Sequence, residues 1–468
     1  MITGELHIDT ALLNTISSEQ AVHYRIIPKK LVNGKLFLLT DSTDEALNDE
    51  LNTVLGREVL LTNIHKEALN KLLAVNYRTQ GGETVEDLSY SSDFLTRVIV
   101  KAQLIGSSDI LFETAEQTKR IRYRIDGKLK EFFIIPQDEY PIIVNQIKIK
   151  AGLDISEKRL PQDGRISLKL KGNDIDIRVS TLPTLYGEKI VLRLLKKDAS
   201  NIYLENLGFS KDELNTYKSG ILKPNGIMLI SGPTGSGKTT TLYATLKELN
   251  KEDTNILTIE DPIEYTLNGI NQVQLKESIG LDFTNTLKTF LRQDPDIIMV
   301  GEIRDAKTAN MAIRAALTGH LVLSTIHTNS ATATISRLMD MGIPPFLIAG
   351  TLNMSVAQRL IRRLCSQCKT KQEDAHERFP ELFSSCKELN THYIPNGCNA
   401  CNYTGFRGRQ AIYEIIPITN EVQEAIKSQA TDLKSTLALN YVTLKDNALN
   451  MVCKGETSVE EVYPILSN

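Results

Sequence analysis

The feature that most constrains this chain is a glycine-rich segment placed between an apolar run and a helical pattern. Residues 232–239 read Gly-Pro-Thr-Gly-Ser-Gly-Lys-Thr and match G-x-x-x-x-G-K-[ST]. The apolar run Ile227–Ile230 precedes the segment, and a helix is expected over Thr240–Leu249. In such a strand–loop–helix unit, backbone N–H groups and the helix N-terminus point at phosphate oxygens. The alternative, a glycine-rich turn that binds nothing, leaves the flanking strand and helix unexplained.

The motif gives separate tasks to its residues. Lys238 is expected to reach the β- and γ-phosphates of ATP, and the Thr239 hydroxyl is expected to coordinate Mg²⁺. The residues expected to bind nucleotide are Gly232, Pro233, Thr234, Gly235, Ser236, Gly237, Lys238, Thr239 and Thr240. ATP and Mg²⁺ are therefore the expected ligands of this part of the chain.

Short apolar runs alternate with amphipathic helical patterns from about residue 205 onward. Runs this apolar predict strands covered on both faces, as in a parallel α/β sheet. Glu302 follows one of these runs, so it should lie at the carboxyl edge where ligands bind and should activate the attacking water. The alternative is a solvent-exposed glutamate at a strand end. The four predicted strands are 227–230, 256–259, 297–300 and 321–325.

Two further polar groups follow predicted strands. Glu260, Asp261 and Glu264 come after the second strand. Carboxylates beside a Mg-phosphate centre are expected to hold metal-bound waters or to orient the attacking water. His327 follows the fourth strand and is expected to sense the γ-phosphate by hydrogen bonding; a structural histidine that caps the strand is the alternative.

Length and patterning divide the rest of the chain. Its 468 residues suggest about three domains. Helices are expected over Asp44–Leu55 and Lys66–Val75 in the first of them. The predicted parts are a first unit over 1–78, a flexible linker over 79–92, a small α+β domain over 93–196 and an α/β domain over 205–468.

Charge and hydropathy exclude several classes of protein. Lys and Arg number 54 against 57 Asp and Glu, which argues against a nucleic-acid coat or a polybasic membrane binder. The N-terminus lacks the apolar core of a signal peptide, and no apolar run reaches the roughly 18 residues of a spanning helix. A cytoplasmic protein is therefore expected.

Four of the six cysteines form two C-x-x-C pairs with 29 residues between them. This spacing predicts a tetrahedral Zn²⁺ site with four thiolate ligands and no open coordination position, which would make the zinc structural. Redox-active dithiols and unrelated buried thiols are the alternatives. The expected ligands are Cys365, Cys368, Cys398 and Cys401, in a module over about 362–410; Cys386 and Cys453 have no partner pattern.

Taken together, these motifs resemble those of the secretion ATPase superfamily, in particular the type II secretion and type IV pilus assembly ATPases. Residues 258–265 match the aspartate box, 292–305 match Walker B, and 315–329 match the histidine box. The resemblance is strong over 93–468 and weaker over the first 78 residues. It implies a RecA-like C-terminal domain in a homo-hexameric ring, with a preceding domain that supplies residues to a neighbouring subunit's site.

The resemblance also implies roles for residues of the preceding domain. Arg159–Arg165 matches a stretch of the family, and Arg165 and Arg178 would contact the γ-phosphate in a neighbouring subunit. Ordinary surface ion pairs are the alternative for both arginines. Relatives usually carry Ala-Ser-Asp-Ile-His where residues 107–111 read Ser-Ser-Asp-Ile-Leu, so any role of that histidine does not carry over to Leu111.

Within the resemblance, the four-cysteine module favours assembly motors over retraction motors. The expected function is Mg-ATP hydrolysis that drives assembly of pilin-like subunits in type II protein secretion, with type IV pilus extension as the alternative. A nucleic-acid motor and a non-hydrolysing scaffold are further alternatives, and no nucleic acid is expected as a partner. The first 78 residues resemble a module that docks on an inner-membrane protein, although a regulatory or folding role would also fit. The chain would then be peripherally associated with the inner membrane through docking and platform proteins.

Overall fold

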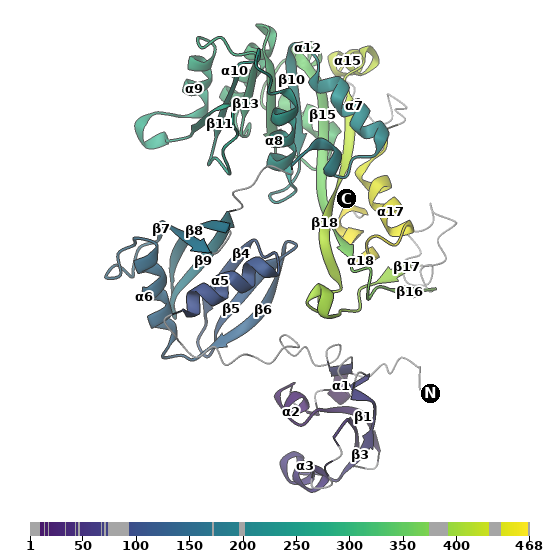
Figure 1. Cartoon of the computed structure of the whole chain (residues 1–468). Coiled ribbons are helices and arrows are strands. Elements are labelled where there is room, and N and C mark those ends of the chain that lie inside the picture. The colour runs from purple at the N-terminus through teal and green to yellow at the C-terminus, as the bar shows by residue number, and fades with distance from the viewer. Residues whose placement is uncertain are drawn as a thin grey trace. The chain divides into compact units, whose positions relative to one another are not determined.

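The computed structural model divides the chain into two compact units, each described by itself. The first comprises residues 1–162, 180–191 and 396–405, and the second comprises 163–179, 192–395 and 406–468. The expected linker 79–92 and Cys386 lie outside the described residues. The residues described are 10–13, 15–16, 18–32, 34–42, 44, 47–66, 68–69, 72–73, 93–170, 173–195, 202–373, 392–429 and 441–466 (Figure 1).

The N-terminal part is a three-stranded sheet in the order β1-β2-β3. Strands β1 and β2 are antiparallel, whereas β2 and β3 are parallel and therefore need a crossover. The predicted helix over Asp44–Leu55 begins at Leu47. Of the helix expected over Lys66–Val75, residues 66, 68, 69, 72 and 73 are described and are helical. The elements are α1 (Thr10–Leu13), α2 (Ser18–His23), β1 (Ile26–Val32), β2 (Lys35–Thr40), α3 (Leu47–Leu55) and β3 (Val59–Asn63).

A six-stranded sheet follows in the order β6-β5-β4-β9-β8-β7. Strands β4 to β6 form an antiparallel meander, with Asp126 and Gly127 both at positive φ in the turn between β5 and β6. The apolar side of α5 is buried, including Phe94 and Val98. The elements are α5 (Phe94–Leu104), β4 (Asp109–Thr114), β5 (Lys119–Ile125), β6 (Lys128–Ile135), α6 (Tyr140–Lys150), β7 (Gln162–Leu170), β8 (Asn173–Thr184) and β9 (Gly187–Leu195).

The second unit contains a seven-stranded sheet in the order β12-β11-β13-β14-β10-β15-β18. Neighbouring strands from β12 to β15 are parallel, as expected, but β18 runs antiparallel to β15 at the edge. The chain turns back between β15 and β18, so the sheet is mixed and not purely parallel. The strands are β10 (Gly226–Ser231), β11 (Ile256–Glu260), β12 (Asn271–Gln274), β13 (Ile297–Val300), β14 (Leu321–Ile326), β15 (Leu352–Leu364) and β18 (Phe406–Pro417).

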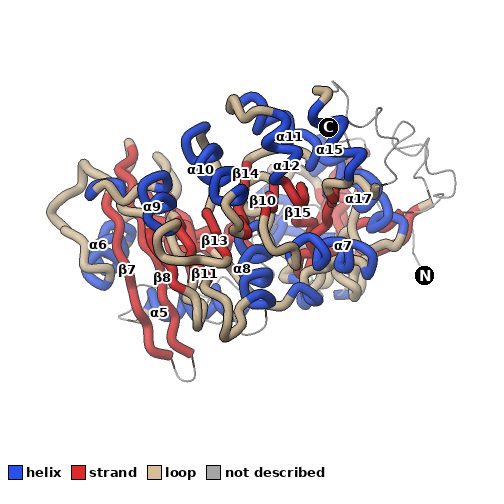
Figure 2. Tube along the Cα trace, turned by 90° about the horizontal axis from the view of Figure 1, so that it is seen from above, coloured by secondary structure: helices blue, strands red, loops and turns tan. Residues whose placement is uncertain are grey.

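Helices cover both faces of this sheet (Figure 2). Along β10, Met228 and Ile230 belong to the core shared with α7 and α8, whereas Ile227 and Leu229 belong to the core shared with α10 to α12. This two-sided burial explains why β10 is apolar at successive positions. The helices are α7 (Lys211–Ile221), α8 (Lys238–Leu249), α9 (Phe283–Phe290), α10 (Ala306–Leu317), α11 (Ala331–Asp340), α12 (Pro345–Thr351), α15 (Asn420–Lys427), α17 (Leu444–Cys453) and α18 (Val459–Leu466).

Smaller elements complete the described chain. A two-stranded antiparallel sheet, β16 (Thr370–Gln372) and β17 (His392–Ile394), lies in the segment between β15 and β18. Among the described residues, no helix combines the length and apolar character needed to cross a membrane.

Candidate active site

The glycine-rich loop joins β10 to α8, as the motif predicts. Gly237 is the N-cap of α8 and has φ +89°, a left-handed conformation that favours glycine. Gly232 has no room for a side chain, because an added Cβ would lie 2.5 Å from the carbonyl oxygen of Gln358. The loop backbone is therefore shaped for phosphate oxygens by glycines at both ends.

Lys238 lies at the start of α8 and is buried. Its ammonium donates to the carbonyl oxygens of Gly232 at 2.8 Å and Pro233 at 3.1 Å. Burial lowers the pKa of Lys238, the Glu302 carboxylate opposes this effect, and the charge of Arg359 adds to it. The cation is thus held against the loop by neutral oxygens.

The other predicted loop residues differ in exposure. Ser236 is 3% exposed, and its hydroxyl oxygen has no hydrogen-bond partner among the described residues. Thr239 is exposed and Thr240 is half-buried at the start of α8. Pro233, Thr234 and Gly235 are exposed. A buried hydroxyl without a partner beside a buried ammonium fits an anionic ligand, and the accessible Thr239 hydroxyl fits Mg²⁺.

Gln358, on β15, also holds the loop. Its side-chain amide donates to the carbonyl oxygen of Ser236 at 2.9 Å, and its amide oxygen accepts from Thr241 on α8 at 2.9 Å. The residue is 2% exposed. Sequence reasoning did not find Gln358, because β15 also carries other polar residues such as Asn353 and Ser355, and nothing in the run singles out Gln358.

Glu302 lies just beyond β13 and pairs with two residues. One carboxylate oxygen lies 3.1 Å from Nε2 of His327, and the other pairs with Arg304. The Glu302 side chain is 15% exposed, against 50% for His327 and 63% for Arg304. The hydrogen bond and charge of Glu302 raise the pKa of Arg304. The structure thus brings together the two predicted residues Glu302 and His327 at the carboxyl edge of the sheet.

The three predicted carboxylates after β11 have different surroundings. Glu260 is 3% exposed and accepts hydrogen bonds from Tyr243, from Thr258 at 2.6 Å and from Gln272 at 3.0 Å. Asp261 is exposed and Glu264 is half-buried. Three neutral donors therefore hold Glu260, and the bond from Tyr243 ties the end of β11 to α8.

The two predicted arginines lie in the six-stranded sheet. Arg165, on β7, is exposed and has no polar partner among the described residues. Arg178, on β8, is half-buried and donates to the carbonyl oxygen of Ile263 at 2.8 Å within the second unit. Leu111 on β4 is 5% exposed, so an apolar side chain suits that position.

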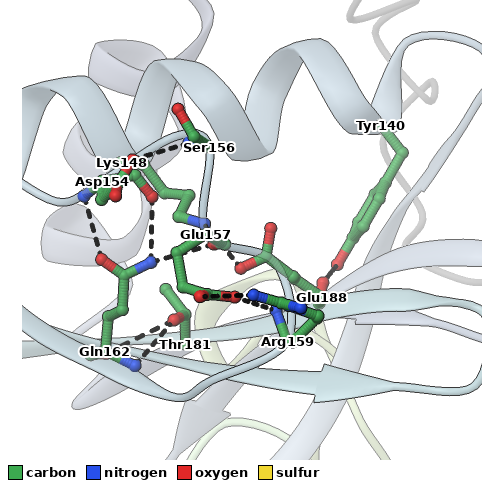
Figure 3. A network of polar contacts seen from close by, with 9 residues as sticks. All are labelled: Tyr140, Lys148, Asp154, Ser156, Glu157, Arg159, Gln162, Thr181 and Glu188. Carbon is green, nitrogen blue, oxygen red and sulfur yellow. Dashed lines mark hydrogen bonds and ion pairs between the residues drawn. The ribbon is translucent and has the colours of Figure 1, made fainter.

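A buried polar network supports the segment that leads to Arg165 (Figure 3). Lys148 is completely buried on α6, and its ammonium lies 2.8 Å from a carboxylate oxygen of Glu188 and 2.7 Å from the carbonyl oxygen of Glu157. Gln162 donates to the carbonyl oxygen of Glu157 at 3.1 Å. The Glu157 carbonyl is therefore held by Lys148 on α6 and by Gln162, which is the first residue of β7.

The four predicted zinc ligands gather together. The sulfur atoms of Cys365, Cys368, Cys398 and Cys401 all lie within 4.8 Å of one another. The Cys401 sulfur accepts backbone hydrogen bonds from Cys398 and Gly405, both at 3.2 Å. Four clustered sulfurs with N–H donors around one of them fit a metal-binding thiolate set.

Comparisons with known proteins agree on one family. A family profile described as "Type II/IV secretion system protein" matches residues 84–464. The Type II secretion system protein E of Aeromonas hydrophila is 46% identical, with 89% of each chain covered. The Type II secretion system ATPase E of Vibrio cholerae is 44% identical over 81% of this chain and 77% of the relative. The Type IV pilus assembly ATPase PilB of Myxococcus xanthus is 45% identical over 81% of this chain and 69% of the relative.

Solved structures agree with this chain in fold. The ATPase DotB of Legionella pneumophila matches with a TM-score of 0.61 and 21% identity, over 82% of this chain and 97% of that one. The pilus retraction motor PilT with bound ADP matches with a TM-score of 0.54 and 24% identity, over 79% and 95% of the two chains. The predicted RecA-like α/β fold is therefore confirmed.

Proposed function

Because this chain belongs to the type II/IV secretion system family of ATPases, we propose that it hydrolyses Mg-ATP to drive assembly of pilin-like subunits in type II protein secretion. The observation that carries the proposal is Glu302, held at the carboxyl edge of the sheet that also carries the glycine-rich loop. A carboxylate in that place can accept a proton from the attacking water. The relatives named as type II secretion proteins cover most of the chain.

Each residue of the site has a defined part in this reaction. The loop N–H groups and Lys238 would bind the phosphates, and Thr239 would hold Mg²⁺, which supplies positive charge to the phosphate oxygens when bound. Glu302 takes the proton of the attacking water, and His327 orients that carboxylate. Asp261 and Glu264 would hold waters around bound Mg-phosphate, while Glu260 keeps β11 and α8 in place.

The active assembly in this proposal is a homo-hexamer in which a neighbouring subunit completes each site. Arg165 supports this part, because an exposed guanidinium without a polar partner among the described residues is available to a phosphate of another subunit. Arg178 is the second candidate, and contact with the phosphate would require it to leave the Ile263 carbonyl. Cationic contacts of this kind stabilise transition-state charge only when subunits close.

The four-cysteine cluster and the N-terminal sheet have roles in the assembly of the secretion system and not in ATP hydrolysis. Zn²⁺ held by the four cysteines would tie the residues that follow β15 to those that precede β18. The three-stranded N-terminal sheet docks on an inner-membrane partner, and motion passes to a platform protein. The protein would act in the cytoplasm, peripherally at the inner membrane, and the nearly balanced charge favours protein partners over nucleic acid.

Type IV pilus extension is the second candidate function, supported by the pilus assembly ATPase of Myxococcus xanthus at 45% identity. A strain lacking the gene separates the two functions by comparison of the proteins it releases with the fibres on its surface. Loss of specific secreted proteins with intact fibres supports type II secretion. Loss of fibres with intact secretion overturns it in favour of pilus extension, and purified protein without Mg-ATP hydrolysis would contradict both.

A further inference from the structure

Arg359 on β15 lies against the first glycine of the nucleotide-binding loop. In the sheet, Ala357 pairs with Ser231, the last residue of β10, so the next residues of β15 run beside the loop. An added Cβ on Gly232 would lie 3.2 Å from Nη1 of Arg359. The guanidinium is therefore in van der Waals reach of the loop that binds phosphate.

The bonds of Arg359 go to backbone carbonyl groups on two segments. Nη1 donates to the carbonyl oxygen of Gln358 at 3.0 Å, and Nη2 donates to that of Asn329 at 2.8 Å. Asn329 belongs to the loop that follows His327, so the guanidinium spans from β15 to the histidine-bearing loop. A guanidinium has five N–H donors, and two neutral acceptors leave most of them available.

The hydrogen-bond partners of Arg359 carry no negative charge, and the acid that acts on it, Glu414, does so without an ion pair among the described residues. Within the described part of the chain, no carboxylate forms an ion pair with Arg359, although the residue is half-buried. Burial lowers its pKa, which the charge of Glu414 opposes. A half-buried cation held only by carbonyl groups is costly unless an anion joins it.

The nearby groups point to the kind of anion. Lys238 is a second buried cation in the same neighbourhood, and its carboxylate neighbour Glu302 already pairs with Arg304 and His327. The buried Ser236 hydroxyl without a partner would lie 2.6 Å from a Cβ on Gly232. Two cations and an unused hydroxyl around one glycine suit a polyphosphate group.

We propose that Arg359 binds a phosphate group of the nucleotide from the same subunit as the glycine-rich loop. This assignment rests on the proposed ATPase function, and it adds to the site a cation that does not depend on a neighbouring subunit. The bond to the Asn329 carbonyl joins this contact to the loop that carries His327. Phosphate binding and the position of the histidine loop are thereby linked through one side chain.

The competing explanation is that Arg359 only braces the two segments through its carbonyl bonds. Substitution by lysine distinguishes this explanation from phosphate binding. Arg359→Lys keeps the positive charge but loses the planar fork that spans two carbonyl groups. Arg359→Gln loses the charge. If Arg359 binds phosphate, Arg359→Gln should bind nucleotide much more weakly than Arg359→Lys does. If Arg359 is only a structural brace, both variants should lose nucleotide affinity and stability to the same extent.

The test measures displacement of a fluorescent ATP analogue from the full-length protein by ATP and by inorganic tripolyphosphate. We expect Arg359→Gln to weaken both competitors by about tenfold or more, and Arg359→Lys to retain most of the affinity. Arg337→Gln, at an exposed position of α11, is the matched control and should bind like wild type. Melting temperatures of all variants are recorded alongside.

Two results would overturn the assignment. One is wild-type affinity of Arg359→Gln for ATP and tripolyphosphate; the other is an equal loss of affinity and melting temperature in both Arg359 variants. Wild-type protein that binds ATP without hydrolysing it would overturn the proposed function instead, while the comparison of Arg359 variants would keep its meaning.

Discussion

The Nε2 atom of His327 lies 3.1 Å from one carboxylate oxygen of Glu302, and Arg304 pairs with the other oxygen. The two partners come from different loops, one directly after β13 and the other after β14. A carboxylate held at both oxygens cannot rotate freely, so its free lone pairs keep a fixed direction. Such fixed placement is what a catalytic base at the carboxyl edge of the sheet requires.

Replacement of Glu302 by glutamine should separate nucleotide binding from hydrolysis. Glutamine keeps the size of the side chain but cannot accept the proton of the attacking water. We expect kcat to fall by about 10²–10⁴-fold while ATP still binds. Phosphate release and ATP binding measure the two effects, with Glu252→Gln at an exposed turn as control. An unchanged rate would remove Glu302 from the mechanism.

His327→Gln should lower kcat by roughly tenfold, because Glu302 loses one of the two groups that orient it. The melting temperature should stay within about a degree, since the His327 side chain is 50% exposed and surface substitutions cost little. A variant that melts earlier but turns over normally would instead indicate a histidine that only caps β14.

Arg165→Ala and Glu302→Gln should complement each other if sites form between subunits. Each variant alone should hydrolyse ATP poorly, because one lacks the cation and the other the base. In a mixed ring, some sites receive Arg165 from one subunit and Glu302 from its neighbour, and activity should recover in part. The measurement is the ATPase rate as a function of the ratio in which the two variants are mixed. Rates that equal the weighted average of the two separate variants would argue against a shared site.

Cys401→Ser should release the metal and destabilise the segment around it. Four thiolates predict about one zinc per chain in the wild-type protein, and a serine oxygen is a poor substitute. Zinc content by mass spectrometry and the melting temperature should both fall. Cys453→Ser is the matched control, because Cys453 lies on α17 outside the four-sulfur cluster. Full zinc occupancy in Cys401→Ser would contradict this ligand set.

The stability of the folded protein at acidic pH should depend on Glu113 in β4. Burial alone would raise the pKa of Glu113, but hydrogen bonds and charges from Arg122 and Lys189 lower it from 4.5 to about 2. As the pH falls, Glu113 therefore takes up a proton in the unfolded chain before it does so in the folded protein. The stabilisation that the ionised carboxylate gives above pH 4.5 is lost as the pH falls toward 2. Glu113→Gln should be less stable than wild type at pH 7, and this difference should shrink on acidification.

Denaturant midpoints between pH 7 and pH 3 measure that difference, with the exposed Glu116→Gln as control. A gap between wild type and Glu113→Gln that stays constant over this range would contradict the assigned cause.

The predictable part of the molecule was the part with local signals. The β13 prediction over 297–300 was correct, and the glycine-rich loop joins the predicted strand and helix, because apolar runs and motif spacing are short-range patterns. The same motifs identified Glu302 and His327, and the structure brings them into contact. Sequence spacing thus located the carboxyl edge of the sheet.

Long-range contacts were not predictable in this way. Gln358 and Arg359 meet the loop from β15, over a hundred residues away, and no spacing rule connects the two segments. The three carboxylates after β11 look equivalent in sequence. In the structure, however, Glu260 is buried and accepts hydrogen bonds from Tyr243, Thr258 and Gln272. The antiparallel edge strand β18 was missed for the same reason, since its direction depends on the path of the chain after β15.

Strand β15 is a single element of thirteen residues. It carries Gln358 and Arg359 beside the glycine-rich loop, and it ends at Leu364, one residue before the first cysteine of the four-sulfur cluster. At about 3.3 Å per residue, Arg359 and Cys365 are separated by roughly 20 Å of extended chain. β15 pairs with β18 from Met354 to Leu364, with a register shift between Arg362 and Leu364, so the loop end and the cysteine end of the strand belong to one sheet. A nucleotide bound at the loop and a metal bound at the four cysteines would share this one strand, and by reciprocity each would then change the affinity of the protein for the other.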